Sequence, residues 1–195
     1  MFLHKSFNNS LKVIPLFKNI NEYENFRNLS QKPIVKNLSS FKIKTGNFVW
    51  NQNKEFCFYK KVPKSIPLIN GPNINNDGID LENQRNSTFP YCIPIKSKYI
   101  KNDELIIYRR MSPIGNIDRM IATIINGKDE RFSNGYVLEN HVNFISGSKS
   151  KLKDLLEFIT SREFNNLLNS FCHTNQVSSN DLKTIFELLS SFKND

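Results

Sequence analysis

The sequence lacks the features that mark secreted, metal-binding and membrane proteins. Its three cysteines (Cys57, Cys92 and Cys172) are odd in number, scattered and without CxxC spacing, which argues against a disulfide framework and a zinc site. No apolar run approaches the roughly 18 residues needed to span a bilayer. The first residues also lack the apolar core and small-residue cleavage site of a signal peptide. We therefore expect a soluble cytoplasmic protein with no membrane partner.

A set of residues that could carry catalysis is also missing. His141 follows Glu139 by two residues, but no nucleophile or third ligand accompanies the pair. A hydrogen-bonded structural histidine is therefore favoured over a general base or a metal ligand. No E-x-K or D-x-K element lies near the acidic pairs that could suggest a nuclease, which are Asp80 with Glu82 and Asp103 with Glu104. The sequence predicts no catalytic residue and no metal site in this chain.

What is present is a chain long enough to bury a hydrophobic core. Its 195 residues are 38% hydrophobic and include 16 Phe, which indicates one domain or a domain with a small helical appendage. Residues 66–90, rich in Pro, Gly and Asn, predict a loop excursion, and residues 117–125 fit either a strand or a helical turn. Strands are predicted around a hairpin turn at residues 45–47, over residues 105–109, and over residues 135–145 with a bend at 139–141.

From Ser148 onward the apolar spacing becomes helical. Ser161 is expected to cap the second of three helices, and Ser178 or Ser179 the third. A short helix with Asn21 as its N-cap is also expected over residues 21–30. Strands first and helices last predict an α+β fold. We expect a β-rich region of mixed or antiparallel strands over residues 1–147, and a bundle of about three helices over residues 148–195 that packs on it.

Positive charge is concentrated in the first part of the chain. Residues 1–75 contain 12 Lys and Arg against three acids, a net charge of +9, whereas residues 76–195 contain 15 of each sign. Such a segment attracts polyanions, and with duplex DNA it would confer affinity without sequence preference. A solubilising surface in a Lys-rich protein explains the same charge equally well. Aromatic residues interleave with the basic ones, Trp50 among them, and most of these are expected in the core.

Short tracts between about residues 40 and 188 resemble, in their order, segments of a known family. This family comprises the C-terminal target-recognition domains of adenine-N6 DNA methyltransferases from restriction-modification systems, the TaqI-like class among them. The tracts are TG at 45–46 with VWN at 49–51, IPLI at 66–69, LIIYRR at 105–110, DRMIA at 118–122, VLENHVN at 137–143, LLNS at 167–170 and HTNQVSSNDL at 173–182. Relative to the family's closing block, the chain carries one extra residue, Asn175.

The resemblance implies a module that binds double-stranded DNA opposite a catalytic domain. Family members carry a Gly-containing loop for S-adenosylmethionine and an Asn/Asp-Pro-Pro-Tyr/Phe motif, and neither is present here. The resemblance therefore implies that this chain binds no cofactor and that S-adenosylmethionine would bind a separate methyltransferase catalytic domain or subunit. The target adenine must leave the base stack to be methylated there.

Arg109, Arg110 and Arg119 are the preferred DNA contacts, because Arg is scarce in the chain and suits paired contacts with guanine. The alternative is that one of them pairs with Asp118 or Glu139 and only holds a strand in place. The loop at 173–176 could touch DNA or cap helices, and capping is slightly favoured. The full set of expected DNA contacts is Lys42, Lys44, Trp50, Lys60, Lys61, Arg109, Arg110, Arg119, His173 and Gln176.

Two other functions stay open. One is a type II restriction endonuclease whose carboxylates are not evident from spacing. The other is a non-catalytic protein-interaction subunit, in which the terminal helices bind a partner and the basic segment is incidental.

Overall fold

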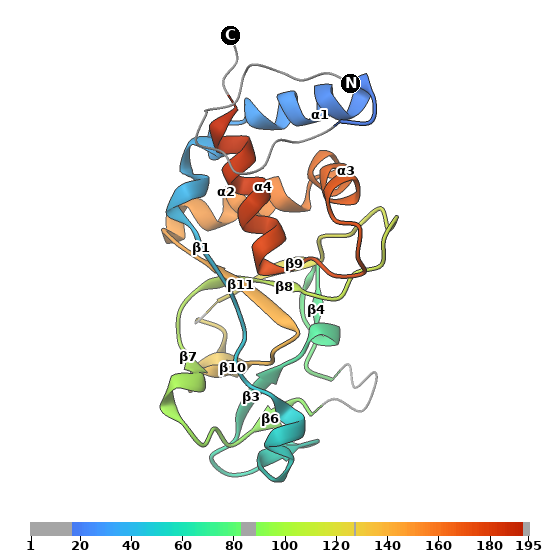
Figure 1. Cartoon of the computed structure of the whole chain (residues 1–195). Coiled ribbons are helices and arrows are strands. Elements are labelled where there is room, and N and C mark those ends of the chain that lie inside the picture. Colours follow the sequence, from blue (N-terminus) through green and yellow to red (C-terminus); the bar gives the residue numbers. More distant parts are fainter. Residues whose placement is uncertain (1–16, 83–88, 127, 193–195) are drawn as a thin grey trace.

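Three layers of secondary structure follow one another along the molecule (Figure 1), which is α+β as the sequence predicts. The computed structural model describes residues 17–82, 89–126 and 128–192. Helices form the upper layer, a four-stranded sheet the middle layer and a five-stranded sheet the lower layer. Part of the basic segment, residues 1–16, lies outside the described residues.

The middle sheet is antiparallel, with the order β1-β11-β8-β9. The expected strand at 105–109 is confirmed as β8, and the ambiguous segment at 117–125 contains β9. β8 is an unbroken apolar run because both of its faces are covered: Ile106 and Tyr108 face the helices, and Leu105 and Ile107 face the lower layer. The strands are β1 (Lys42–Thr45), β8 (Leu105–Arg109), β9 (Ala122–Ile125) and β11 (Val142–Ser146).

The three C-terminal helices are present but do not form a bundle of their own. They share one core with the N-terminal helices and with one face of the middle sheet. Ser161 and Ser178 cap α3 and α4 as predicted, whereas the N-cap of the first helix is Asn19 and not Asn21. The helices are α1 (Ile20–Ser30), the 3-10 helix η1 (Pro33–Ser40), α2 (Lys149–Thr160), α3 (Arg162–Phe171) and α4 (Ser179–Ser191).

The lower sheet has the order β2-β6-β3-β10-β7, and its β3–β10 pair is parallel. The loop expected over residues 66–90 is wrong, because its first residues form the buried central strand β3. Strands this short, bracketed by Pro, Gly and Asn, have the composition of a loop. The strands are β2 (Cys57–Phe58), β3 (Ile66–Ile69), β6 (Tyr91–Cys92), β7 (Ile100–Lys101) and β10 (Tyr136–Leu138), with β4 (Ile74–Asn75) and β5 (Gly78–Ile79) as a separate pair.

Two connections cross between the sheets at one place. The predicted hairpin at residues 45–47 is wrong: β1 pairs with β11, and the chain then passes Gly46 into the lower layer, where Phe48 bridges Glu139. The segment 135–145 does bend at 139–141 as predicted, but its halves, β10 and β11, belong to different sheets. The turn at 139–141 and the segment after Gly46 therefore lie where the chain passes between the two sheets.

Candidate functional site

The turn at residues 139–141 meets two other segments that are distant in sequence. The backbone N–H of Arg110, just after β8, donates to the carbonyl oxygen of His141 over 3.0 Å, and the N–H of Val177 donates to the carbonyl oxygen of Arg110 over 2.8 Å. Met111 forms an antiparallel bridge with Gln176. The end of β8, the 139–141 turn and the loop before α4 therefore form one hydrogen-bonded unit.

The side chain of Arg110 joins the same three segments. Its Nε donates to Oε1 of Gln176 over 3.2 Å, and its Nη1 donates to the carbonyl oxygen of Asn140 over 3.5 Å. Both Arg110 and Gln176 are half-buried. A guanidinium and an amide held in this way can still present polar groups to a ligand, because each has more hydrogen-bonding positions than these contacts use.

Beside this unit lies a cavity of about 390 Å³. Arg109 forms part of its wall and is tied to the β4 segment, because its Nε donates to the carbonyl oxygen of Ile74 over 2.7 Å and its Nη2 to Oδ1 of Asn75 over 3.0 Å. The lining residues are Trp50, Asn70, Gly71, Pro72, Arg109, Met111, Glu139 and His141.

Glu139 and His141 form a pair at this cavity. The Glu139 side chain is 3% exposed and that of His141 is 53% exposed. Oε2 of Glu139 accepts from the backbone N–H of His141 over 2.7 Å, and both carboxylate oxygens lie 3.0 Å from its Nδ1. The hydrogen bond expected for His141 is thus present. Because the carboxylate only accepts when ionised, it favours the tautomer with the proton on Nδ1, which leaves Nε2 unprotonated in the neutral ring.

Arg119 does not lie on the surface. Its side chain is fully buried, where Nη1 donates to the carbonyl oxygens of Cys172 (2.6 Å) and Leu168 (3.2 Å) and Nη2 donates to that of Thr174. In this position the guanidinium cannot reach a nucleic acid, so its expected DNA contact is corrected to a structural role. Its partners are oxygens at the end of α3, neither of the acids considered from the sequence.

The basic residues of the first segment divide between two places. Lys42 and Lys44 are exposed on the edge strand β1, and Lys44 is the cross-strand partner of Phe144. The Nζ of Lys101 lies 5.4 Å from the centre of the Phe144 ring, so Lys101, which is on β7 of the lower sheet, lies close to this edge. Sequence reasoning missed Lys101 because it lies in the electrically neutral part of the chain. Only the pairing of β1 with β11 brings it beside Lys44.

The remaining expected residues lie elsewhere. Lys60 and Lys61 are exposed in the connection between β2 and β3 of the lower sheet. His173 is exposed on the loop before α4, and Trp50 is half-buried against Phe89 with ring centres 5.7 Å apart. The structure therefore brings together Trp50, Arg109, Arg110 and Gln176, but not Lys60 and Lys61.

Asn175, the extra residue, connects two loops through hydrogen bonds. Its carbonyl oxygen accepts from the N–H of Ser112 over 2.9 Å, and its Oδ1 accepts from that of Ile114 over 3.2 Å. The loop after β8 is thereby fastened to the loop before α4. This loop exposes Ile117, whose side chain is 76% exposed.

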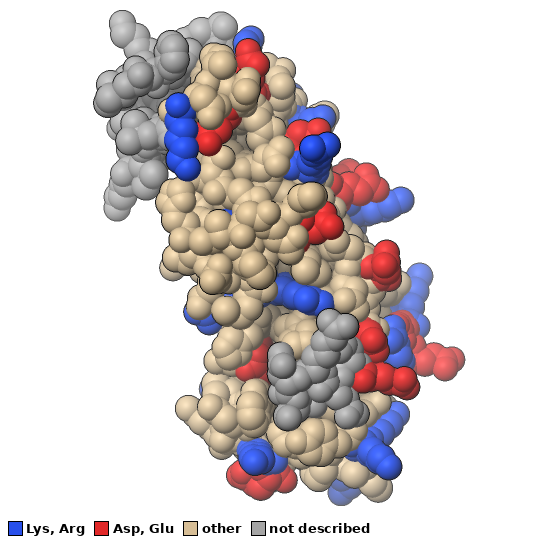
Figure 2. All heavy atoms as spheres, turned by 90° about the vertical axis from the view of Figure 1, so that its right-hand side faces the viewer, with Lys and Arg blue, Asp and Glu red and all other residues tan. Residues whose placement is uncertain are grey.

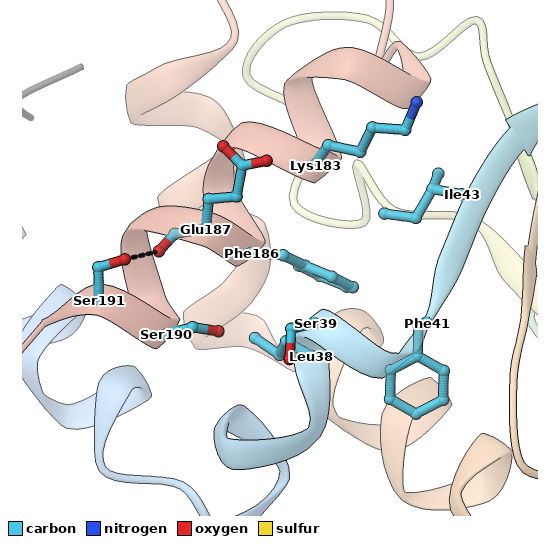
Figure 3. A pocket seen from close by; sticks show the side chains of 9 residues that line it. All are labelled: Leu38, Ser39, Phe41, Ile43, Lys183, Phe186, Glu187, Ser190 and Ser191. Carbon is cyan, nitrogen blue, oxygen red and sulfur yellow. Dashed lines mark hydrogen bonds between the residues drawn. The ribbon is translucent and has the colours of Figure 1, made fainter. Parts of the chain in front are cut away.

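A second cavity, of about 450 Å³, lies between η1, β1 and α4 (Figure 3). Phe186 points from α4 toward Leu38 and Ile43, whereas the carboxylate of Glu187 projects away from these apolar side chains. None of the residues expected to bind DNA lines this cavity.

The charged side chains are not gathered on the face shown in Figure 2. There, basic side chains alternate with acidic ones along one edge and leave a broad uncharged area. Among the described residues, no group of three or more His, Cys, Asp or Glu could hold a metal ion. In the same part of the chain, no helix has the length and apolar character needed to cross a membrane.

No protein-family model matches the chain, and no curated protein matches it significantly.

Proposed function

We propose that this chain recognises a DNA sequence for adenine-N6 methylation, and that the methyl transfer takes place in a separate catalytic domain or subunit. In this proposal the α+β fold is a target-recognition domain and double-stranded DNA is its ligand. The observation that carries the proposal is the meeting of three tracts that resemble this family. The backbone of Arg110 is hydrogen-bonded to that of His141 and to that of Val177, although these residues lie far apart in sequence.

The chemistry of the united tracts suits base recognition. Arg110 and Gln176 hydrogen-bond to each other while both stay half-buried, and these two residue types pair with guanine and adenine edges, respectively. A mutual hydrogen bond fixes their orientation before a ligand arrives, which lowers the ordering cost on binding. Lys42, Lys44 and Lys101 offer positive charge for phosphate contacts, which position a duplex without reading its sequence.

The proposal is tested by selecting a preferred duplex from a random pool and measuring its binding against a scrambled duplex by fluorescence anisotropy. Arg110→Ala and Gln176→Ala should each reduce the preference for the selected duplex by roughly 5- to 100-fold. Arg162→Ala is the matched control, because Arg162 is exposed at the start of α3. Equal preference in all variants, or no duplex binding by the chain, would count against the proposal.

A second experiment tests whether methyl transfer takes place outside this chain. Labelled S-adenosylmethionine incubated with the chain and the selected duplex should transfer no methyl group to DNA. Methylation by the isolated chain would show that the catalytic step is wrongly assigned, and Mg²⁺-dependent cleavage of the duplex would favour an endonuclease.

A further inference from the structure

The cavity beside Arg109 has two apolar walls that come from distant segments. Trp50 follows the crossing from β1, and Met111 follows β8 with its side chain 49% exposed. A half-buried aromatic ring and an exposed thioether, with polar groups around them, are typical of a ligand site. Soft, polarisable side chains of this kind contact flat aromatic ligands well.

Trp50 is held in place by Phe89, which does not line the cavity. Trp50 packs on Phe89, and Nδ2 of Asn70 donates to the carbonyl oxygen of Phe89 over 2.9 Å. Arg109, on another side, is fastened to Ile74 and Asn75. Trp50, Asn70 and Arg109 are thus held by contacts outside the cavity, and a cavity with such support keeps its shape without a ligand.

His141 supplies the cavity with a hydrogen-bonding group. Glu139 holds the Nδ1 side of the ring, and no hydrogen bond among the described residues uses Nε2. In the neutral ring Nε2 accepts a hydrogen bond. A group with N–H donors on the edge of an aromatic plane would therefore be recognised here, with its faces against Trp50 and Met111.

We propose that this cavity binds one unstacked nucleobase of the DNA. The inference rests on the proposed function and names a ligand for the same site. A base inside a duplex has both faces covered by its neighbours, so only a base that has left the stack can lie against Trp50. Single bases are recognised elsewhere through stacking on aromatic side chains and hydrogen bonds to their edges. The strand that carries the base would continue past Arg110, next along the chain from Arg109.

The chain's single tryptophan makes the proposal directly measurable. Because Trp50 is the only Trp, the intrinsic emission of the protein reports on this cavity. Three dye-labelled duplexes are compared: one fully paired, one with a single unpaired base, and one with an abasic residue at the same bulge. The unpaired base should bind roughly 5- to 100-fold more tightly than the abasic bulge, as one stacked base would give, and should quench Trp50 emission.

Variants connect the preference to the cavity. Met111→Ala and His141→Ala should each bring the affinity ratio of the unpaired base to the abasic bulge close to one. Glu187→Gln, in the second cavity (Figure 3), is the matched control and should leave this ratio unchanged. Circular dichroism and thermal unfolding verify that each variant is folded.

The outcomes separate this inference from the proposed function. If the paired duplex binds but the unpaired base and the abasic bulge bind equally, the cavity proposal is overturned and DNA recognition stands. If no duplex binds but deoxynucleoside monophosphates quench Trp50 in a His141-dependent manner, the base site stands and DNA recognition is overturned. If the chain binds neither DNA nor mononucleotides, both are overturned.

Discussion

At the scale of single residues, Arg119 shows how a scarce charged side chain can serve the fold. Its guanidinium donates hydrogen bonds to the carbonyl oxygens of Leu168, Cys172 and Thr174. Leu168 lies in the last turn of helix α3, and the other two residues follow it. The last carbonyl groups of a helix have no partner within it and carry partial negative charge. A buried cation at this point supplies both the missing donors and the compensating charge.

We expect Arg119→Ala to lower the free energy of unfolding by about 3 kcal/mol, because buried oxygens at the end of α3 would lose their donors. Urea denaturation followed by circular dichroism measures the change. Arg119→Lys should retain part of the stability, because an ammonium group can satisfy some of the same oxygens. If Arg119→Ala kept full stability and lost only DNA discrimination, the structural role would be wrong.

The three cysteines give a prediction for alkaline pH. Burial, with a smaller contribution from Glu55, raises the pKa of Cys57 from 9.0 to about 11. Burial raises the pKa of Cys172 to about 11 and that of Cys92 to about 12, with the charges of Asp181 and Cys57, respectively, adding to the rise. Above pH 9 the unfolded thiols lose protons that the folded ones keep, so the stability present below pH 9 should decline as the pH rises toward 11.

Denaturant titrations between pH 7 and pH 11 measure this decline. Cys→Ser substitution at all three positions should make the decline above pH 9 shallower, with the remainder due to Tyr108 and Tyr136, whose pKa burial also raises. The substitutions will also lower stability at every pH. A wild-type free energy of unfolding that stays constant from pH 8 to pH 11 would contradict the buried, protonated thiols.

At the scale of elements, Gly46 permits the crossing from the middle sheet to the lower one. A Cβ at this position would lie 2.3 Å from the carbonyl oxygen of Glu139 and 2.6 Å from that of Leu138. Both are backbone atoms at the end of β10, so neither can move aside as a flexible side chain would. The glycine of the Thr-Gly tract is therefore required by the close packing of two backbone segments at the crossing.

Gly46→Ala should lower the free energy of unfolding by about 3 kcal/mol, since β1 and β10 would have to separate. Gly71→Ala is the matched control, because the nearest atom to its added Cβ would be 3.8 Å away. Thermal unfolding of both variants measures the difference. Equal stability of the two variants would mean that the backbone at the end of β10 can shift to accommodate a Cβ at position 46.

Long periodic elements could be predicted from the sequence, and short ones could not. Helices α2 to α4 and strand β8 have enough apolar repeats, or enough length, to be recognised locally. Strand β3 has four residues, one of them Pro67, between segments of turn composition. Its position depends on partners in β6 and β10, which no local pattern contains.

At the scale of the whole molecule, the basic charge lies in separate places. Lys42 and Lys44 lie on the edge strand β1 of the middle sheet, and Lys101 reaches the neighbouring Phe144 from β7 of the lower sheet. Lys60 and Lys61 lie elsewhere, in the connection between β2 and β3. A duplex held at the edge of the middle sheet would release counterions there only. Substitution of Lys42 with Lys44 should therefore change the salt dependence of duplex affinity, whereas substitution of Lys60 with Lys61 should not.

We expect Lys42→Glu with Lys44→Glu to weaken duplex binding about tenfold or more and to reduce the slope of log affinity against log salt by about 2. Anisotropy titrations at several salt concentrations measure both quantities. Lys149→Glu with Lys153→Glu on α2 is the control of equal charge change, since both are exposed on the helical layer. If the control pair weakened binding equally, net charge alone would explain the affinity, and not the edge of β1.

The sequence by itself determined the α+β class, the helices of the last quarter and the excess of positive charge, because each depends on local composition or period. It also placed Arg110 and Gln176 among the candidate contacts. Only the tertiary structure decided that Arg110 and Gln176 touch, that Arg119 is buried and that Lys101 joins Lys44. Those facts depend on strand pairing and chain crossings between residues far apart in sequence, and a linear pattern carries no information on which distant segments meet.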